Sequence, residues 1–338
     1  MTAHSSTDLA GKRRPASAAS FTGLAQAAER FGLIVVWLVL IAVFGALRPD
    51  TFLTWQNIST VLGSQAVLVI VTLGVIVSLT ANDFDLSIAN TLSLSSITVA
   101  ILNVNHSLPL GVSIAAAIVI GAAVGLVNGF FIIVFRIHSL IVTLGVGTFL
   151  HGIGLWASES QTISGIDPFL SDIVIVRRLF GIPLVFYYAI FLAAAVWYVF
   201  EFTAIGRRIL FVGRGREVAR LSGIHTDRLR WLCLVASGLF GSVAGVFYAG
   251  TQGAADPVSG DSYLLPALAA AFLGSTSILP GRFNPWGSTV AVYFLVTGIT
   301  GLIFLGFGSF IQDMFYGGAL VLAVTLSQIA RGRQEQSF

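Results

Sequence analysis

Long apolar segments alternate with short polar connections along almost the whole chain of 338 residues. A helix of about 20 apolar residues is long enough to cross the hydrocarbon core of a bilayer. Applied along the sequence, this length predicts ten membrane segments, of which the third and the eighth are the weakest and are open to being broken or re-entrant. The segments are approximately 31–47, 59–80, 86–103, 110–135, 139–157, 182–202, 229–251, 264–279, 286–305 and 309–330. The pattern therefore predicts an all-α, polytopic transmembrane helix bundle.

The two ends of the chain are polar. Residues 1–30 are rich in Ser and Ala and carry four basic residues. The apolar run 31–47 that follows is longer than the apolar core of a cleavable signal peptide, so we interpret it as an uncleaved first helix. We expect residues 1–30 to form a disordered cytoplasmic tail, residues 31–330 the transmembrane domain, and residues 331–338 a cytoplasmic C-terminal tail.

Basic residues are distributed unevenly over the predicted connections. With the N-terminus inside the cell, only Arg48, Arg177 and Arg178 fall outside, and the other fifteen of the 18 basic residues fall inside. Cytoplasmic loops concentrate Arg and Lys, and removal of one middle segment would invert every later connection and destroy this asymmetry. The charges thus predict an even number of segments, with both termini cytoplasmic.

One connection, the loop 203–228, is the most basic, and together with Arg230 it holds seven arginines. A cytoplasmic loop of this size and charge suits the docking of a soluble partner protein. The alternative is a basic loop that only sets the topology and contacts anionic lipid.

The composition excludes several classes of protein. Hydrophobic residues make up 56% of the chain and charged residues 10%, whereas a soluble domain carries about 25% charged residues, so this is an integral membrane protein. The net charge of +3 does not indicate nucleic-acid binding, because the basic residues are confined to predicted cytoplasmic parts. The lone Cys233 lies in an apolar run and fits a packing role.

The motifs of common enzyme sites are absent from the sequence. The single lysine, Lys12, belongs to no Gly-x-x-x-x-Gly-Lys-[Ser/Thr] phosphate loop. The five histidines lack the spacing of metal ligands, and no Gly-x-Ser-x-Gly motif occurs. We therefore expect no enzyme active site, no metal and no cofactor on this chain.

Small residues recur every four positions in two of the predicted helices. This spacing lines one helix face and lets helix backbones approach closely, although glycine is also simply frequent in membrane helices. Either interpretation predicts a compact bundle. The two sets are Gly121, Gly125 and Gly129, and Ser237, Gly241, Gly245 and Ala249.

The segment 80–87, Thr-Ala-Asn-Asp-Phe-Asp-Leu-Ser, places two carboxylates between two apolar runs. One interpretation is a cytoplasmic loop in which Asp85 or Ser87 caps the next helix. The other is a broken helix near a transport pathway, with polar groups facing a water-filled cavity. Asp83 and Asp85 would also suit a proton relay.

Several stretches together resemble one family. The run Gly125-Leu-Val-Asn128-Gly129, followed by residues 136–145 (RIHSLIVTLG), resembles the membrane permeases of ribose-type bacterial ABC sugar importers. In the basic loop, the glycine and arginines of 206–208 and the run 216–224 (REVARLSGI) resemble that family's cytoplasmic motif, and residues 273–282 resemble its Gly-Gly-Thr-Ser stretch. The resemblance covers roughly residues 55–330. The acidic motif departs from the family, since polar residues and a second carboxylate replace glycines at 82–85.

The resemblance implies that residues 206–224 form a cytoplasmic coupling segment, a short helix that docks into a cleft on an ATP-binding cassette ATPase. It also implies a periplasmic sugar-binding protein that delivers substrate, a second permease chain that completes a homodimer or heterodimer, and a location in the bacterial inner membrane. ATP would bind the partner subunit. The coupling residues that we expect are Gly206, Arg207, Arg208, Arg216, Glu217, Ala219, Arg220 and Gly223.

Few charged residues lie within the predicted bundle, which favours a small, neutral, polar substrate such as a monosaccharide or polyol. The residues that we expect along the substrate path are Asn82, Asp83, Asp85, Ser87, Asn128 and Thr143. The primary hypothesis is the permease subunit of an ATP-driven sugar importer. The alternatives are a proton-coupled secondary carrier that uses Asp83 and Asp85, and a membrane scaffold or receptor, which the absence of a sizeable soluble domain disfavours.

Overall fold

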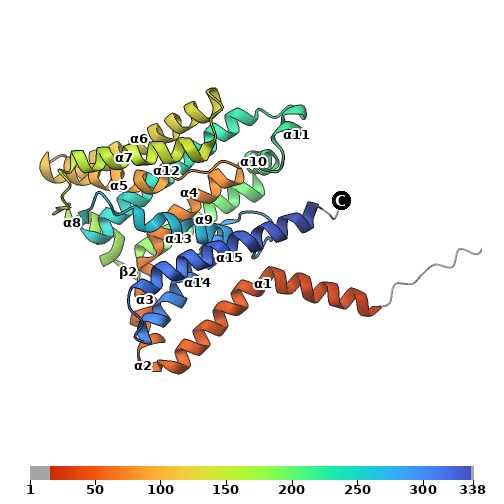
Figure 1. Cartoon of the computed structure of the whole chain (residues 1–338). Coiled ribbons are helices and arrows are strands. Elements are labelled where there is room, and N and C mark those ends of the chain that lie inside the picture. Colours follow the sequence, from red (N-terminus) through yellow and green to blue (C-terminus); the bar gives the residue numbers. More distant parts are fainter. Residues whose placement is uncertain (1–15, 336–338) are drawn as a thin grey trace, which may run out of the picture.

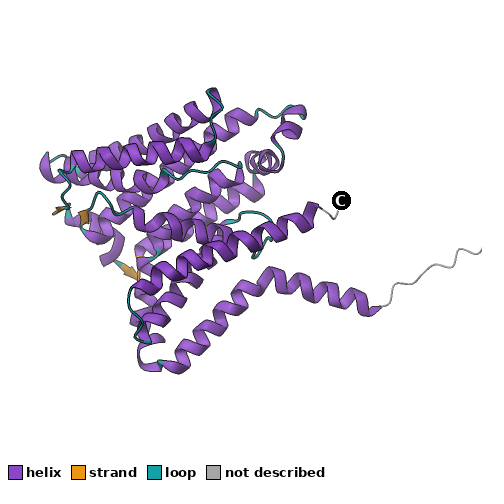
Figure 2. Ribbon diagram, in the orientation of Figure 1, coloured by secondary structure: helices purple, strands orange, loops and turns teal. Residues whose placement is uncertain are grey.

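Helices make up almost all of the structure (Figure 2). The computed structural model describes residues 16–335, and the side chains of residues 30–327. Within this part of the chain, nine helical segments are long and apolar enough to cross a membrane. The predicted all-α, polytopic bundle is confirmed.

The helices and strands follow one another with short connections. The α-helices are α1 (Ala16–Leu47), α2 (Pro49–Phe52), α3 (Trp55–Ser64), α4 (Ala66–Thr80), α5 (Ile88–Ala100), α6 (Leu110–Gly129), α7 (Ser139–Ala157), α8 (Pro168–Ser171), α9 (Leu184–Phe202), α10 (Ala204–Arg214), α11 (Arg216–Leu221), α12 (Thr226–Gln252), α13 (Asp261–Gly274), α14 (Pro285–Phe304) and α15 (Phe310–Glu335). Three π-helical turns are η1 (Ile101–Asn105), η2 (Phe130–Val134) and η3 (Asp172–Val176), and the strands are β1 (Ile163–Ser164), β2 (Arg178–Leu179), β3 (Ile182–Pro183) and β4 (Ala254–Ala255).

The expected tails are described only in part. Residues 16–30, which the sequence assigns to the N-terminal tail, belong to α1, and α15 continues to Glu335. Residues 1–15 and 336–338 lie outside the described residues.

The centre of the bundle is α4. Its fifteen residues are apolar on every side apart from three hydroxyl groups, and all fifteen are buried, as a helix without a polar face requires. In the most apolar 18-residue window of each span, buried residues make up 72% within Trp55–Thr80, against 11% within Arg30–Leu47 of α1 and 17% within Phe310–Ser327 of α15. Helices α9, α12, α13 and α14 pack around α4, whereas the described parts of α1 and α15 are mostly exposed or half-buried.

Close helix packing explains both sets of small residues. The glycines of α6 face α12: a Cβ atom added at Gly125 would overlap the Cα atom of Val235, and one added at Gly129 would lie 3.0 Å from the Trp231 ring. Gly241 and Gly245 of α12 face the other way, against α5. The predicted compact packing is confirmed, and α12 is the helix that joins the two sets.

Nine of the ten predicted segments coincide with long helices to within a few residues. The eighth, predicted at 264–279, is shorter: α13 ends at Gly274 and has 14 residues, or about 21 Å at 1.5 Å per residue, less than the ~30 Å hydrocarbon core. The helix ends there because the side-chain amide of Asn284 donates to the carbonyl groups of Gly274 and Ser277. The following residues, 275–284, are irregular.

The two ends of the bundle differ in charge. Figure 1 shows the start of α1 and the end of α15 at the same end of the bundle as α10 and α11. The opposite end carries α2, α8 and β2 (Figure 1), and with them Arg48, Arg177 and Arg178. We refer to the first as the basic end and to the second as the outer end. At the outer end, β1 pairs with β4 and β2 with β3, both antiparallel.

Candidate coupling and translocation site

The polar segment 81–87 folds back into the bundle. The chain leaves α4 at Thr80 and turns at Asn82, whose φ of 61° is in the left-handed region. The chain then returns alongside α4. Ile88, at the start of α5, packs against Gly74 so closely that a Cβ atom added at Gly74 would overlap the Ile88 side chain. Asp83, Asp85 and Ser87 are buried. This geometry corresponds to the broken-helix interpretation of the sequence and not to a loop on the surface.

Hydroxyl groups of α7 satisfy the backbone of this segment. The N–H of Phe84 donates to Ser139 Oγ at 3.0 Å, and the N–H of Leu86 donates to Thr143 Oγ1 at 3.1 Å. Residues four apart lie on one face of a helix, so Ser139 and Thr143 present two acceptors to two successive inward N–H groups of an extended chain. Without them, these buried donors would lack partners, which is costly.

The second half of the segment forms a buried polar cluster with α6. The Ser87 hydroxyl donates to Asp85 Oδ1 at 2.6 Å, and the amide of Asn128 donates to Ser87 Oγ at 2.8 Å. Asp85 Oδ1 also accepts the backbone N–H of Ser87, the residue before α5, whereas the Ser87 side chain does not cap that helix. Within the described residues, Asp85 Oδ2 and Asn128 Oδ1 are buried and have no hydrogen-bond partner.

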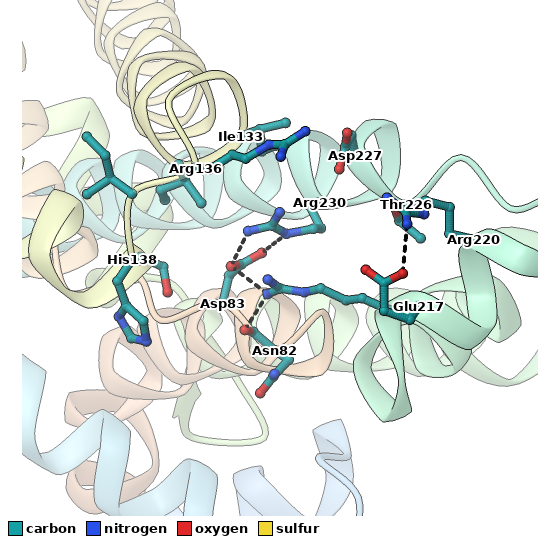
Figure 3. A pocket seen from close by; sticks show the side chains of 14 residues that line it. Asn82, Asp83, Ile133, Arg136, His138, Glu217, Arg220, Thr226, Asp227 and Arg230 are labelled. Atoms are coloured by element: carbon teal, nitrogen blue, oxygen red, sulfur yellow. Dashed lines mark hydrogen bonds and ion pairs between the residues drawn. The ribbon is translucent and has the colours of Figure 1, made fainter.

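Asp83 lies at the other end of the segment, between two arginines. Arg230 of α12 donates from Nε to Oδ2 at 2.7 Å and from Nη2 to Oδ1 at 2.8 Å. Arg216 of α11 donates from Nη2 to Oδ1 at 2.9 Å and to the Asn82 carbonyl at 2.8 Å. Figure 3 shows Asp83 joined to Arg230 on one side of a cavity at the basic end. The cavity has a volume of about 460 Å³ and is also lined by Arg136, His138, Glu217 and Arg220.

The expected coupling residues occupy two short helices with different exposure. Arg207, Arg208, Glu217, Arg220 and Gly223 are exposed, and Arg216 is half-buried.

Gly206 and Ala219, by contrast, are buried and hold the two helices against the bundle. A side chain at Gly206 would overlap the backbone of α9. The outward apolar surface of α11 is instead formed by Val218 and Leu221, which are 58% and 85% exposed.

The structure brings the expected path residues together in one connected network, with the exception that Asn82 contributes its backbone and exposes its side chain. Two members were missed in the sequence. The sequence does not single out Ser139, and Arg230 is counted there only with the basic loop. An ionisable residue inside a predicted span indicates a nearby partner, and Arg230 lies at the start of the apolar run 229–251, so that signal was present.

Comparison with known proteins assigns the chain to a transport family. The family described as "Branched-chain amino acid transport system / permease component" matches residues 57–324. No solved structure matches the chain.

Three curated relatives are similar over nearly their whole length. The D-allose transport system permease protein AlsC of Escherichia coli (strain K12) is 27% identical and is aligned over 89% of this chain and 92% of its own. The L-arabinose ABC transporter permease protein AraH of Azospirillum brasilense is 30% identical, over 92% and 91%. The ribose import permease protein RbsC of Escherichia coli (strain K12) is 28% identical, over 86% and 91%.

These matches and the nine apolar helices describe a multi-pass protein of the inner membrane that acts as a transport subunit. The match to residues 57–324 covers most of the chain, which therefore belongs to the family of transport-system permease components.

Proposed function

We propose that this chain is the permease subunit of an ATP-driven importer of a monosaccharide or related polyol. The observation that carries the proposal is the end-to-end similarity to permeases whose names specify D-allose, ribose and L-arabinose. In this proposal a periplasmic binding protein delivers the solute at the outer end, a second permease chain completes the path, and a separate ATPase at the basic end supplies the energy.

The chemistry of the buried network favours a neutral solute over a zwitterionic amino acid, which the family description also mentions. Ser87, Asn128 and Thr143 provide neutral hydroxyl and amide groups. The buried charges Asp83 and Arg230 are paired with each other, so neither is free to bind a substrate ammonium or carboxylate group. Asp85 is the one further carboxylate of the network, and Ser87 hydrogen-bonds it.

The proton-coupled carrier is disfavoured by the contacts of Asp83. Both of its carboxylate oxygens accept hydrogen bonds from guanidinium groups. Arginine keeps its charge in proteins, so both oxygens of Asp83 are engaged in ion pairs within the chain. A carrier would have to rely on Asp85 alone.

The first test is a pull-down of the tagged chain, gently solubilised from its native membrane, with identification of the proteins that accompany it. We expect an ATPase with a P-loop and a periplasmic binding protein.

The purified binding protein is then heated with a panel of pentoses, hexoses and polyols, and with leucine and isoleucine as the competing class. A rise in melting temperature with one sugar or polyol would support the proposal. Recovery of the chain alone in several detergents, or stabilisation by the amino acids only, would contradict it.

A further inference from the structure

Asp83 is bound by arginines from two different helices, and only one of these helices is part of the exposed coupling segment. Arg230 belongs to the long helix α12, holds both carboxylate oxygens, and has a side chain that is 11% exposed. Arg216 is the first residue of α11, holds one oxygen, and has a side chain that is 37% exposed. Arg230 therefore anchors Asp83 inside the bundle, whereas Arg216 connects it to the surface.

Helix α11 reaches the turn at 82–83 through Arg216, while the neighbouring helix α10 packs against Thr80 at Gly213. Helix α11 has six residues, of which only Ala219 is buried. Val218 and Leu221 are exposed, and the exposed Glu217 lines the cavity that also contains Asp83. Two charge-assisted hydrogen bonds from the Arg216 guanidinium group, to Asp83 and to the Asn82 carbonyl, tie the start of α11 to the turn at 82–83. Such bonds are shorter and stronger than those between neutral groups.

Beyond Asp83, the same stretch of backbone reaches the candidate path. Phe84 and Leu86 are hydrogen-bonded to the two hydroxyl groups of α7, and Ser87 to Asn128 of α6. The segment is extended and short, so a displacement of the turn at 82–83 must change these hydrogen bonds or be transmitted through them. A continuous chain of contacts thus joins α11 to α7 and α6 through one buried carboxylate.

We propose that the Arg216–Asp83–Arg230 cluster is the element that transmits movement of the coupling segment to the polar segment 84–87, with Asp83 as a positioning residue. This inference rests on the proposed function, because it requires an ATPase that moves α11. In this proposal the cluster has two states. In both, Arg230 keeps its two hydrogen bonds to Asp83, and in only one does the half-exposed Arg216 bind Asp83; in the other, water takes its place.

The test is hydrogen–deuterium exchange with the complete transporter, comprising the chain, its ATPase and its binding protein in lipid nanodiscs. Exchange is followed in two peptides, one covering residues 81–90 and one covering residues 216–224, without nucleotide and after trapping with ATP and orthovanadate. Coupling between two sites typically amounts to about fivefold or more. We expect a change of at least that size in the exchange rates of both peptides.

The decisive variant is Arg216→Gln, which leaves the Asp83–Arg230 pair intact. We expect the peptide 216–224 to keep its response to nucleotide, because the partner still binds α11, and the peptide 81–90 to lose its response. The control variant is Arg177→Gln, which removes an exposed arginine–carboxylate pair at the outer end and should leave both responses unchanged. An undiminished response of the peptide 81–90 in Arg216→Gln would overturn the inference.

A second variant separates transmission from docking. Asp83→Asn changes a buried group that cannot touch the ATPase, and if it folds it should also abolish the response of the peptide 81–90. The double variant should then be no worse than either single one, since residues that act through one contact are not additive. If the unsubstituted complex hydrolyses ATP but the peptide 81–90 never responds, the transmission is refuted and the proposed function stands. If no ATPase associates with the chain, the proposed function itself fails.

Discussion

At the scale of single residues, the buried ion pair of Asp83 with Arg230 is the contact whose loss we expect to cost the most stability. Its removal leaves Arg230, which is largely buried, without a counter-charge. Breaking a buried ion pair by removing one partner costs about 3–5 kcal/mol. We predict that Asp83→Asn lowers the unfolding temperature of the purified chain in detergent markedly.

The matched control for this prediction is Arg177→Gln. The Arg177–Asp172 pair has the same chemistry, but its side chains are 61% and 36% exposed, and exposed pairs contribute about 1 kcal/mol or less. Equal small shifts for both variants would show that the Asp83 cluster does not stabilise the fold.

A second residue-scale prediction concerns Thr143. Its hydroxyl group accepts the N–H of Leu86 and donates to the Ser139 carbonyl. Thr143→Val keeps the shape of the side chain but leaves a buried donor unsatisfied, which costs about 1–3 kcal/mol. We predict that this variant loses stability and solute uptake, measured by thermal unfolding and by uptake into cells that lack other transporters for the solute. Thr143→Ser retains the hydroxyl group and should remain close to the parent in both measurements.

The sequence could indicate the polar segment but not its partners. Two carboxylates between apolar runs are unusual enough to predict a buried or broken element, and the structure confirms burial at Asp83 and Asp85. Ser139 could not be recognised, because a single serine in an apolar helix has no distinctive pattern in the sequence. Its partner, the N–H of Phe84, lies 55 residues away along the chain. Arg230 did carry a signal, since it is an ionisable residue at the start of an apolar run, but its partner Asp83 lies 147 residues away and could not be identified. Pairings of this kind depend on helix order in space, which hydropathy does not encode.

At the scale of elements, the packing of α6 on α12 is the most sensitive contact. A Cβ atom at Gly125 would overlap the backbone of α12 at Val235, and backbone cannot move aside as a flexible side chain can. We predict that Gly125→Ala reduces the amount of folded protein in the membrane, measured by fluorescence-detected size exclusion of a tagged chain.

Gly111 provides a control within the same helix. An added Cβ atom there meets no atom within 4 Å, and alanine is a better helix former than glycine by about 1 kcal/mol. Gly111→Ala should therefore fold at least as well as the parent. A normal yield from Gly125→Ala would mean that α6 and α12 separate more easily than their contact suggests.

Element boundaries show where hydropathy succeeds and where it fails. Nine spans were predictable, because the length of an apolar run is set by the bilayer itself. The end of α13 was not, because residues 275–279 (STSIL) contain no charge or proline that would mark a helix end. Side-chain hydrogen bonds from Asn284 terminate the helix there. In the basic loop, the family resemblance implied one short helix, and the structure has two, α10 and α11. Thr203 caps α10, and Gly215 separates it from α11.

At the scale of the whole molecule, the opposite ends of the bundle should face opposite sides of the membrane. The basic end holds the seven arginines of 207–230, and the outer end holds Arg48, Arg177 and Arg178. We predict that a membrane-impermeant maleimide labels Gln161→Cys in intact spheroplasts and labels His225→Cys only after permeabilisation. Both positions are exposed, and Cys233→Ala removes the native thiol. The reverse labelling pattern would invert the topology and remove the argument that α11 meets a cytoplasmic ATPase.

The last prediction joins the exposed helix α11 to transport by the whole assembly. Glu217 and Arg220 form an exposed pair, and such a pair contributes little to folding, so Glu217→Arg should insert and fold normally. Reversal of a charge at a docking surface, by contrast, opposes the partner. We therefore predict that Glu217→Arg uncouples ATP hydrolysis from transport, so that proteoliposomes no longer show hydrolysis stimulated by the loaded binding protein. Normal stimulation in Glu217→Arg would place the ATPase contact elsewhere on the basic end, and the exposed arginines of α10 would then be the surface to change next.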